Sequence, residues 1–230
     1  MSGEAQFDDY SESYDAALAE GLSVTGEDKE YFARQRVAWL ARCLAKLGAQ
    51  PRAVIDFGCG IGSATPYLRE LLGAESVLGV DVSARCLEVA RQTWGSEGSR
   101  FALLDECEPN EQFDLAFCNG VFHHIAPGER AGALSFVYRS LRSGGWFALW
   151  ENNPWNPGTR YIMSRCPFDQ DAIMLTPPAS RRMLEAAGFE IVSTTFLFIF
   201  PKVLAWLRGI EPAVSGLPFG GQYQVLCRKP

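Results

Sequence analysis

The sequence Val-Ile-Asp-Phe-Gly-Cys-Gly-Ile-Gly at residues 54–62 decides the fold class of this chain. A short apolar run leads directly into glycines at positions 58, 60 and 62. Because glycine has no Cβ and adopts positive φ at little cost, such a turn lets the backbone pack closely against a ligand at the head of a helix. The segment therefore predicts a buried strand, a ligand-binding turn and a helix, in that order.

Short apolar runs alternate with helical patterns after this segment. The alternation predicts an α/β fold, a Rossmann-like and mostly parallel sheet with helices on both faces and ligands at the carboxyl ends of its strands. A later helix and two further apolar runs predict an antiparallel strand pair at the sheet edge. The expected strands are residues 53–57, 76–80, 100–104, 113–118, 145–150, 189–200 and 222–228, and the expected helices are 63–72, 84–93, 129–141 and 177–187.

The composition indicates one folded domain over residues 1–230, with 47% hydrophobic and 21% charged residues. A net charge of -6 provides no basic surface for phosphate backbones, so no nucleic-acid partner is expected. The seven scattered cysteines lack a Cys-x-x-Cys pair, which indicates reduced thiols in the cytoplasm and no metal site. No secretory signal is seen, and the apolar run at residues 196–207 is too short for stable membrane insertion.

Three acidic residues lie at predicted strand ends. Asp56 comes two residues before the first glycine, where a carboxylate would repel a pyrophosphate and attract a cationic cofactor. Ser63 also breaks the dinucleotide-binding pattern Gly-x-Gly-x-x-Gly, so a nicotinamide-dependent oxidoreductase is the weaker alternative. Asp81 suits two ribose hydroxyls but could instead cap the next helix, and Asp105 could simply begin a turn.

Four motifs, in family order, resemble those of the class I S-adenosylmethionine-dependent methyltransferases. They are residues 54–62, Gly-Val-Asp-Val-Ser at 79–83, Phe-Asp-Leu-Ala-Phe-Cys-Asn-Gly-Val-Phe-His-His-Ile at 113–125 and Leu-Arg-Ser-Gly-Gly-Trp-Phe at 141–147. The resemblance implies a seven-stranded sheet, S-adenosylmethionine as cofactor, and an enzyme that methylates a small-molecule acceptor. It leaves the acceptor unidentified.

The resemblance also implies which residues bind the cofactor. The methionine portion would lie against Asp56, Gly58, Gly60 and Gly62, the ribose against Asp81 and Val82, the adenine against Asp105 and Glu106, and the methyl donor against Cys118 and Asn119. Cys118 could equally be a small core residue. Tyr10 and Tyr14 resemble part of a lid that closes on the bound molecules, and their four-residue spacing suits an ordinary packing helix as well.

The domain is accordingly divided into four expected parts. Residues 1–50 form a helical lid, 53–150 the cofactor-binding core, 151–176 an acceptor-side loop, and 177–230 a C-terminal helix and strands.

The only two histidines of the chain, His123 and His124, directly follow the fourth predicted strand. Histidine titrates near neutrality, so either ring could remove a proton from an acceptor. The resemblance favours His123 as the residue that faces the acceptor, while His124 could merely cap or pack the next helix. Glu151, at the end of the fifth predicted strand, could orient an imidazole, bind the acceptor, or be a plain surface carboxylate.

The segment at residues 151–169 contains three prolines, which argue against a continuous helix, and several aromatic residues. Loops of this kind often form ligand pockets at the edge of such a sheet. Trp155, Arg160, Tyr161 and Arg165 are therefore expected to bind the acceptor. The aromatic residues could instead be buried against the sheet, and Arg165 could pair with Asp169.

Several alternatives stay open at this point. An oxygen acceptor is favoured, with His123 as the base, but nitrogen or carbon could receive the methyl group. A non-catalytic S-adenosylmethionine-binding partner protein would keep the same cofactor residues. The apolar segment at residues 196–219 could cover the acceptor or form a homodimer contact.

Overall fold

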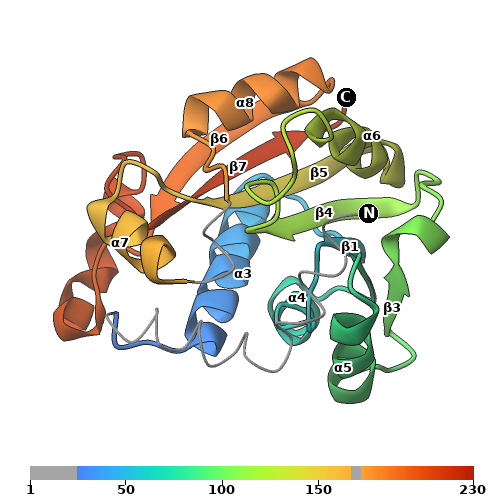
Figure 1. Cartoon of the computed structure of the whole chain (residues 1–230), viewed down its shortest axis with the longest axis horizontal. Coiled ribbons are helices and arrows are strands. Elements are labelled where there is room, and N and C mark those ends of the chain that lie inside the picture. The colour runs from blue at the N-terminus through green and yellow to red at the C-terminus, as the bar shows by residue number, and fades with distance from the viewer. Residues whose placement is uncertain (1–24, 167–171) are drawn as a thin grey trace.

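The structure is a computed structural model that describes residues 25–166 and 172–230. These residues form a seven-stranded sheet flanked by helices (Figure 1). The strand order is β3-β2-β1-β4-β5-β7-β6. The strands are β1 (Ala53–Phe57), β2 (Ser76–Asp81), β3 (Ser99–Leu103), β4 (Phe113–Asn119), β5 (Leu141–Asn152), β6 (Glu190–Leu197) and β7 (Gln222–Arg228).

Six strands run in one direction and β7 runs in the other. β1 pairs in parallel with β2 and β4, and β7 lies antiparallel between β5 and β6. Gln222, the first residue of β7, therefore lies opposite Asn152, the last residue of β5. The start of β7 thus joins the carboxyl ends of β1, β2, β4 and β5 at one edge of the sheet, where this topology places ligands. The predicted fold class is confirmed.

Helices cover both faces of the sheet (Figure 1). Leu134, Val137 and Leu184, on α6 (Arg130–Ser140) and α8 (Pro177–Ala186), pack into the core on one face. Leu40 and Leu68, on α3 (Lys29–Lys46) and α4 (Thr65–Leu72), pack into the core on the other face. Further elements are α5 (Ala84–Trp94), η1 (Leu104–Glu106), α7 (Pro157–Arg165), η3 (Lys202–Ile210) and α9 (Glu211–Val214).

The expected acceptor-side loop contains helix α7, which corrects the prediction of an irregular segment. Pro157 occupies the first turn of α7, where its missing N–H needs no partner. The side chain of Asn156 caps the helix by accepting a hydrogen bond from the Thr159 N–H at 3.0 Å. Pro157 therefore begins a helix here. Because a helix repeats every 3.6 residues, α7 turns residues three or four positions apart to the same side, which decides what it can contribute to a site.

One strand boundary also differs from the prediction. The strand expected at residues 189–200 ends at Leu197, because Phe198 takes a positive φ of 64° and turns the chain away from the sheet. Within the segment expected to be a lid, α3 buries Val37 and Leu44 against the sheet and is thus a packed part of the core. Tyr10 and Tyr14 lie outside the described residues.

No helix within the described ranges combines the length and apolar character needed to cross a bilayer.

Candidate active site

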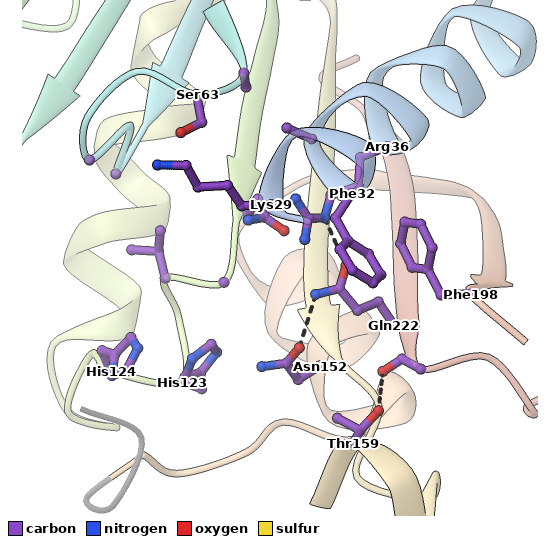
Figure 2. Close-up of a pocket in the computed structure, with 18 of the residues that line it drawn as sticks. Lys29, Phe32, Arg36, Ser63, His123, His124, Asn152, Thr159, Phe198 and Gln222 are labelled. Atoms are coloured by element: carbon purple, nitrogen blue, oxygen red, sulfur yellow. Dashed lines mark hydrogen bonds between the residues drawn. The ribbon is translucent and has the colours of Figure 1, made fainter. Parts of the chain in front are cut away.

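A cavity of about 790 Å³ lies at the sheet edge formed by the carboxyl ends of β1, β2, β4 and β5 and the start of β7 (Figure 2). This volume is typical of sites that enclose a small molecule. Lining residues are spread along the described chain from Thr25 to Gln222. The cavity is therefore built by segments that are distant in sequence.

The glycine turn forms one end of the cavity and is fixed to the end of β2. The N–H groups of Gly58 and Cys59 donate to the Val80 carbonyl at 2.8 and 3.1 Å. Gly58 has a φ of +71°, and a Cβ at this position would collide with a methyl group of Val121. The turn thus needs glycine at position 58, and its backbone lies open to the cavity.

Asp81 holds this turn in place. Its Oδ2 accepts a hydrogen bond from the Gly60 N–H at 2.7 Å, and its Oδ1 accepts one from the Ser83 N–H at 3.0 Å. Asp81 also lines the cavity, and the exposed Val82 lines it next to Asp81. Asp81 does not cap the following helix, as the alternative interpretation held. Ser83 is the cap, because its hydroxyl accepts a hydrogen bond from the Cys86 N–H.

Asp56 lies beneath the glycine turn and is only 3% exposed. Burial, with a smaller contribution from the nearby Asp81 carboxylate, raises the pKa of Asp56 to about 8. A positive charge beside Asp56 would favour its ionised form. The carboxyl groups of Asp56 and Asp81 thus lie together at this end of the cavity.

The other predicted cofactor residues lie in three kinds of place: on the cavity wall, on the exposed surface, and behind the wall. Asn119 lines the cavity, and none of the described residues donates a hydrogen bond to its buried Oδ1. Asp105 and Glu106 are exposed on η1, and the neighbouring Leu104 lines the cavity in their place. Two predicted residues lie behind the cavity wall: Cys118 is fully buried in the core, and a Cβ on Gly62 would meet the Trp94 ring at 2.9 Å.

His123 and His124 line the middle of the cavity, and their ring centroids are 4.1 Å apart. His123 is 3% exposed, and its Nδ1 lies 2.6 Å from Oε2 of Glu151, which is 1% exposed. The other carboxylate oxygen of Glu151 accepts the Phe122 N–H at 2.9 Å. Glu151 is therefore neither a surface residue nor part of the cavity wall. Its carboxylate contacts the His123 imidazole from the protein interior and thereby orients the ring.

The far end of the cavity is formed by α3, β5, α7 and β7. The Arg36 Nε donates to Gln222 Oε1 at 2.7 Å, and Gln222 Nε2 donates to Asn152 Oδ1 at 3.0 Å. Phe32 and Phe198 lie together beside the Arg36 guanidinium, and their ring centroids are 4.9 Å apart (Figure 2). These residues were not predicted, although Asp28 and the helical spacing of apolar residues after it signal the start of α3.

The four described residues predicted to bind the acceptor do not line the cavity. Trp155, Arg160, Tyr161 and Arg165 are all exposed, and the Arg165 guanidinium lies over the Tyr161 ring at 5.4 Å. Asp169, the other suggested partner of Arg165, lies outside the described residues. The opposite side of α7 borders the cavity through Gly158, Thr159, Ile162, Met163 and Cys166. The helical spacing of the residues after Pro157 is the sequence signal that could have identified this side of the segment.

Comparison with known proteins identifies the family. Residues 55–147 match the model of a methyltransferase domain. A trans-aconitate 2-methyltransferase from Azoarcus is 32% identical over 84% of this chain and 83% of its own length. Another, from Rhizobium etli, is 41% identical over 69% of this chain and 68% of its own length. This chain belongs to the class I S-adenosylmethionine-dependent methyltransferases.

The architecture of this methyltransferase agrees with the family. A structure from Thermotoga maritima, named as a possible histamine N-methyltransferase, superposes with a TM-score of 0.68 at 23% identity and covers 97% of this chain and 98% of its own. At this identity the similarity concerns the fold alone. The cofactor of the methyltransferase is S-adenosylmethionine.

The residues at the glycine end of the cavity fit that cofactor. The backbone at Gly60 borders the cavity at a point where a Cβ would meet nothing within 4 Å, Asp56 provides a carboxylate for a cation, and Asn119 Oδ1 faces no donor within the described chain. Figure 2 also shows the Lys29 side chain reaching across the cavity toward Ser63 beside the glycine turn. A lysine there matches the negative charge of the methionine carboxylate.

Replacing Asp81 with alanine is expected to weaken S-adenosylmethionine binding by about tenfold or more, because a hydrogen bond to a charged group is lost. The loss includes the contact with the Gly60 N–H, which shapes the glycine turn. Calorimetric titration with S-adenosylmethionine measures the change, and thermal melts check the fold. Exposed Glu106→Ala serves as a comparison at the neighbouring strand end. Unchanged affinity in Asp81→Ala would remove this residue from the cofactor site.

Proposed function

We propose that this methyltransferase transfers the methyl group to an oxygen atom of a small-molecule acceptor and that His123 removes the proton from that oxygen. The cofactor supplies an electrophilic methyl group on a sulfonium. The protein must then hold the acceptor oxygen in line with that methyl group, exclude water and accept the proton.

The buried pair of His123 and Glu151 carries this proposal. Because Nδ1 faces Glu151 at 2.6 Å, the carboxylate favours the tautomer with the proton on Nδ1. The remaining ring nitrogen, Nε2, then keeps its lone pair. His123 lines the cavity, and its Cε1 lies 3.5 Å from the position of a Cβ on Gly120, another lining residue. Glu151 also stabilises the imidazolium that forms when the proton arrives.

A screen of small oxygen, nitrogen and carbon acceptors with isotopically labelled S-adenosylmethionine tests the proposal. Mass spectrometry of the product locates the label. A label on oxygen supports the proposal, whereas a label on nitrogen or carbon, or cofactor binding without transfer to any acceptor, contradicts it.

Replacing Glu151 with glutamine is expected to lower turnover by about tenfold or more. The carboxylate accepts hydrogen bonds at both oxygens, from Phe122 and His123, while an amide can accept at only one. One of the two donors is then left facing an NH₂ group, which costs roughly 1–3 kcal/mol. Steady-state kinetics measure the effect, with the affinity for S-adenosylmethionine as the readout that should stay constant. Wild-type turnover in Glu151→Gln would show that the carboxylate does not act through His123.

A second candidate is transfer to a carboxylate oxygen. Several relatives, at 27% to 41% identity, are named trans-aconitate 2-methyltransferases. Trans-aconitate carries carboxylates that are ionised at neutral pH, so no base is needed to methylate one of them. Incubation with trans-aconitate and labelled cofactor tests this candidate. A methyl ester whose formation survives loss of His123 would favour it over the base-dependent reaction.

A further inference from the structure

We propose that Gln224 and Trp150 bind a buried water molecule beneath α3 and that this water positions Asn119 at the cofactor end of the cavity. The inference goes beyond the proposed function, because it concerns the binding of S-adenosylmethionine and is independent of the acceptor and of His123. Gln224 thereby becomes a positioning residue, which acts on the cofactor through Asn119.

A row of four side chains crosses the sheet beneath α3. Asn119 on β4 is the register partner of Trp150 on β5. Trp150 is in turn the partner of Gln224 on β7, and Gln224 is the partner of Thr195 on β6. Register partners on neighbouring strands point to the same face of a sheet. Because Trp150 packs in one core cluster with Leu40 of α3, the whole row faces that helix.

Three members of the row have buried polar atoms with no hydrogen-bond partner among the described residues. These atoms are Asn119 Oδ1, Trp150 Nε1, and both Oε1 and Nε2 of Gln224. The set contains two donor groups and two acceptors, so its members are complementary, yet none of them bonds directly to another. Buried polar groups in proteins are nearly always paired with other protein groups or with ordered water. A bridging ligand would therefore satisfy all four atoms.

Helix α3 encloses the row (Figure 1). Its Arg36 Nε donates to Gln222, two residues before Gln224 on β7. Its Trp39 Nε1 donates to Thr195 Oγ1, beside Gln224 on β6, at 2.9 Å. Gln224 is 0% exposed as a result and does not line the cavity. The bridging ligand must therefore be small enough to fit between α3 and the sheet.

Water matches both the chemistry and the spacing of the row. A buried water typically makes about three hydrogen bonds, and it can donate as well as accept. It can thus accept from Trp150 Nε1 and donate to Gln224 Oε1 and Asn119 Oδ1. Neighbouring strands are about 4.8 Å apart, and a water that makes two hydrogen bonds of about 2.8 Å spans roughly 5.6 Å. A single water therefore reaches from one strand of the row to the next.

Asn119 is the end of the row that lines the cavity, beside the glycine turn. A carbonyl oxygen has two lone pairs, so Asn119 Oδ1 can accept one hydrogen bond from the water and another from the cofactor. The water then holds the amide in the orientation that the cofactor needs. Losing this support is expected to weaken S-adenosylmethionine binding by about twofold to tenfold, the effect of one net hydrogen bond.

Oxygen-17 magnetic relaxation dispersion, which counts long-lived buried waters, tests the site in the full chain. Gln224→Met keeps the length of the side chain and removes its amide. We expect it to release at least one buried water and to lower the urea midpoint, because Trp150 and Asn119 lose a shared partner. Thr194→Val is the matched control. Thr194 Oγ1 is also buried without a partner, but Thr194 pairs with Val225, faces the other side of the sheet, and offers a water only one group. Its water count should not change.

Calorimetric titration with S-adenosylmethionine tests the positioning role, with Thr194→Val expected to bind like the wild type. An unchanged water count or a higher urea midpoint in Gln224→Met would show that the amide is simply unpaired, and would overturn the site. Release of water at wild-type cofactor affinity would overturn the effect on Asn119. If Gln224→Met does not fold, a high-resolution crystal structure of the wild type decides. A water bonded to Gln224 and Trp150 supports the proposal, and a direct hydrogen bond between these two side chains overturns it.

Discussion

His123→Ala is expected to lower the turnover rate by about 10²-fold to 10⁴-fold while leaving the affinity for S-adenosylmethionine nearly unchanged. The imidazole borders the middle of the cavity, away from the glycine turn that holds the cofactor end. Its loss removes the group that accepts the acceptor proton. Turnover is measured at saturating cofactor and acceptor, and cofactor affinity is measured by calorimetry.

The pH dependence distinguishes this role from a structural one. Without the base, the variant should regain rate as pH rises, because the acceptor then ionises unaided. His124→Ala provides the comparison, since its ring contacts His123 at a centroid distance of 4.1 Å and lines the same cavity. If His123 is the base, the His124 variant should keep the wild-type shape of the pH profile. An unaltered profile and wild-type turnover in His123→Ala would leave His123 as a packing residue.

The sequence predicted the sheet well because its signals are local. Strands such as β1 and β7 each contain a short apolar run, and their predicted boundaries at residues 53–57 and 222–228 agree with the structure. The glycine turn and the acid at the end of β2 were also visible, because backbone conformation requires glycine at position 58 and the strand end fixes the position of Asp81. Each of these signals lies within one short segment of the sequence.

The part of the cavity away from the glycine turn depends on contacts between distant segments, which no local pattern reveals. Arg36 meets Gln222 across 186 residues of sequence, and His123 meets Glu151 across 28. The prediction chose Arg160 and Arg165 on α7 because their side chains are charged. The helix turns these residues outward and presents Thr159 and Met163 to the cavity. Residue type identified the right segment, and only the helical period shows which side of it faces a ligand.

A second large effect is expected on the free energy of unfolding, and it arises from Asp56. The folded protein holds the pKa of Asp56 at about 8, far above the ordinary value of 3.8, mainly because the carboxyl is buried. Between these values the folded chain keeps a proton that the unfolded chain has lost, so the unfolded state binds fewer protons. The free energy of unfolding of the ligand-free protein must then fall as pH rises from about 4 to about 8, by up to about 1.4 kcal/mol for each pH unit.

Asp56→Asn is therefore expected to flatten this dependence, since the amide is uncharged at every pH. Urea unfolding of the ligand-free protein at intervals from about pH 5 to about pH 8 should show the variant gaining on the wild type as pH increases, with the gap no longer growing above the folded pKa. Asp105→Asn, at an exposed position, should keep the wild-type slope. S-adenosylmethionine should change the wild type in the opposite sense, because a bound cation draws Asp56 toward its ionised form and binding near neutrality then releases a proton. Calorimetry in buffers of different ionisation enthalpy counts that proton. Parallel slopes for Asp56→Asn and wild type, together with no proton release on binding, would show that Asp56 is ionised in the ligand-free protein and that its burial is compensated by other groups.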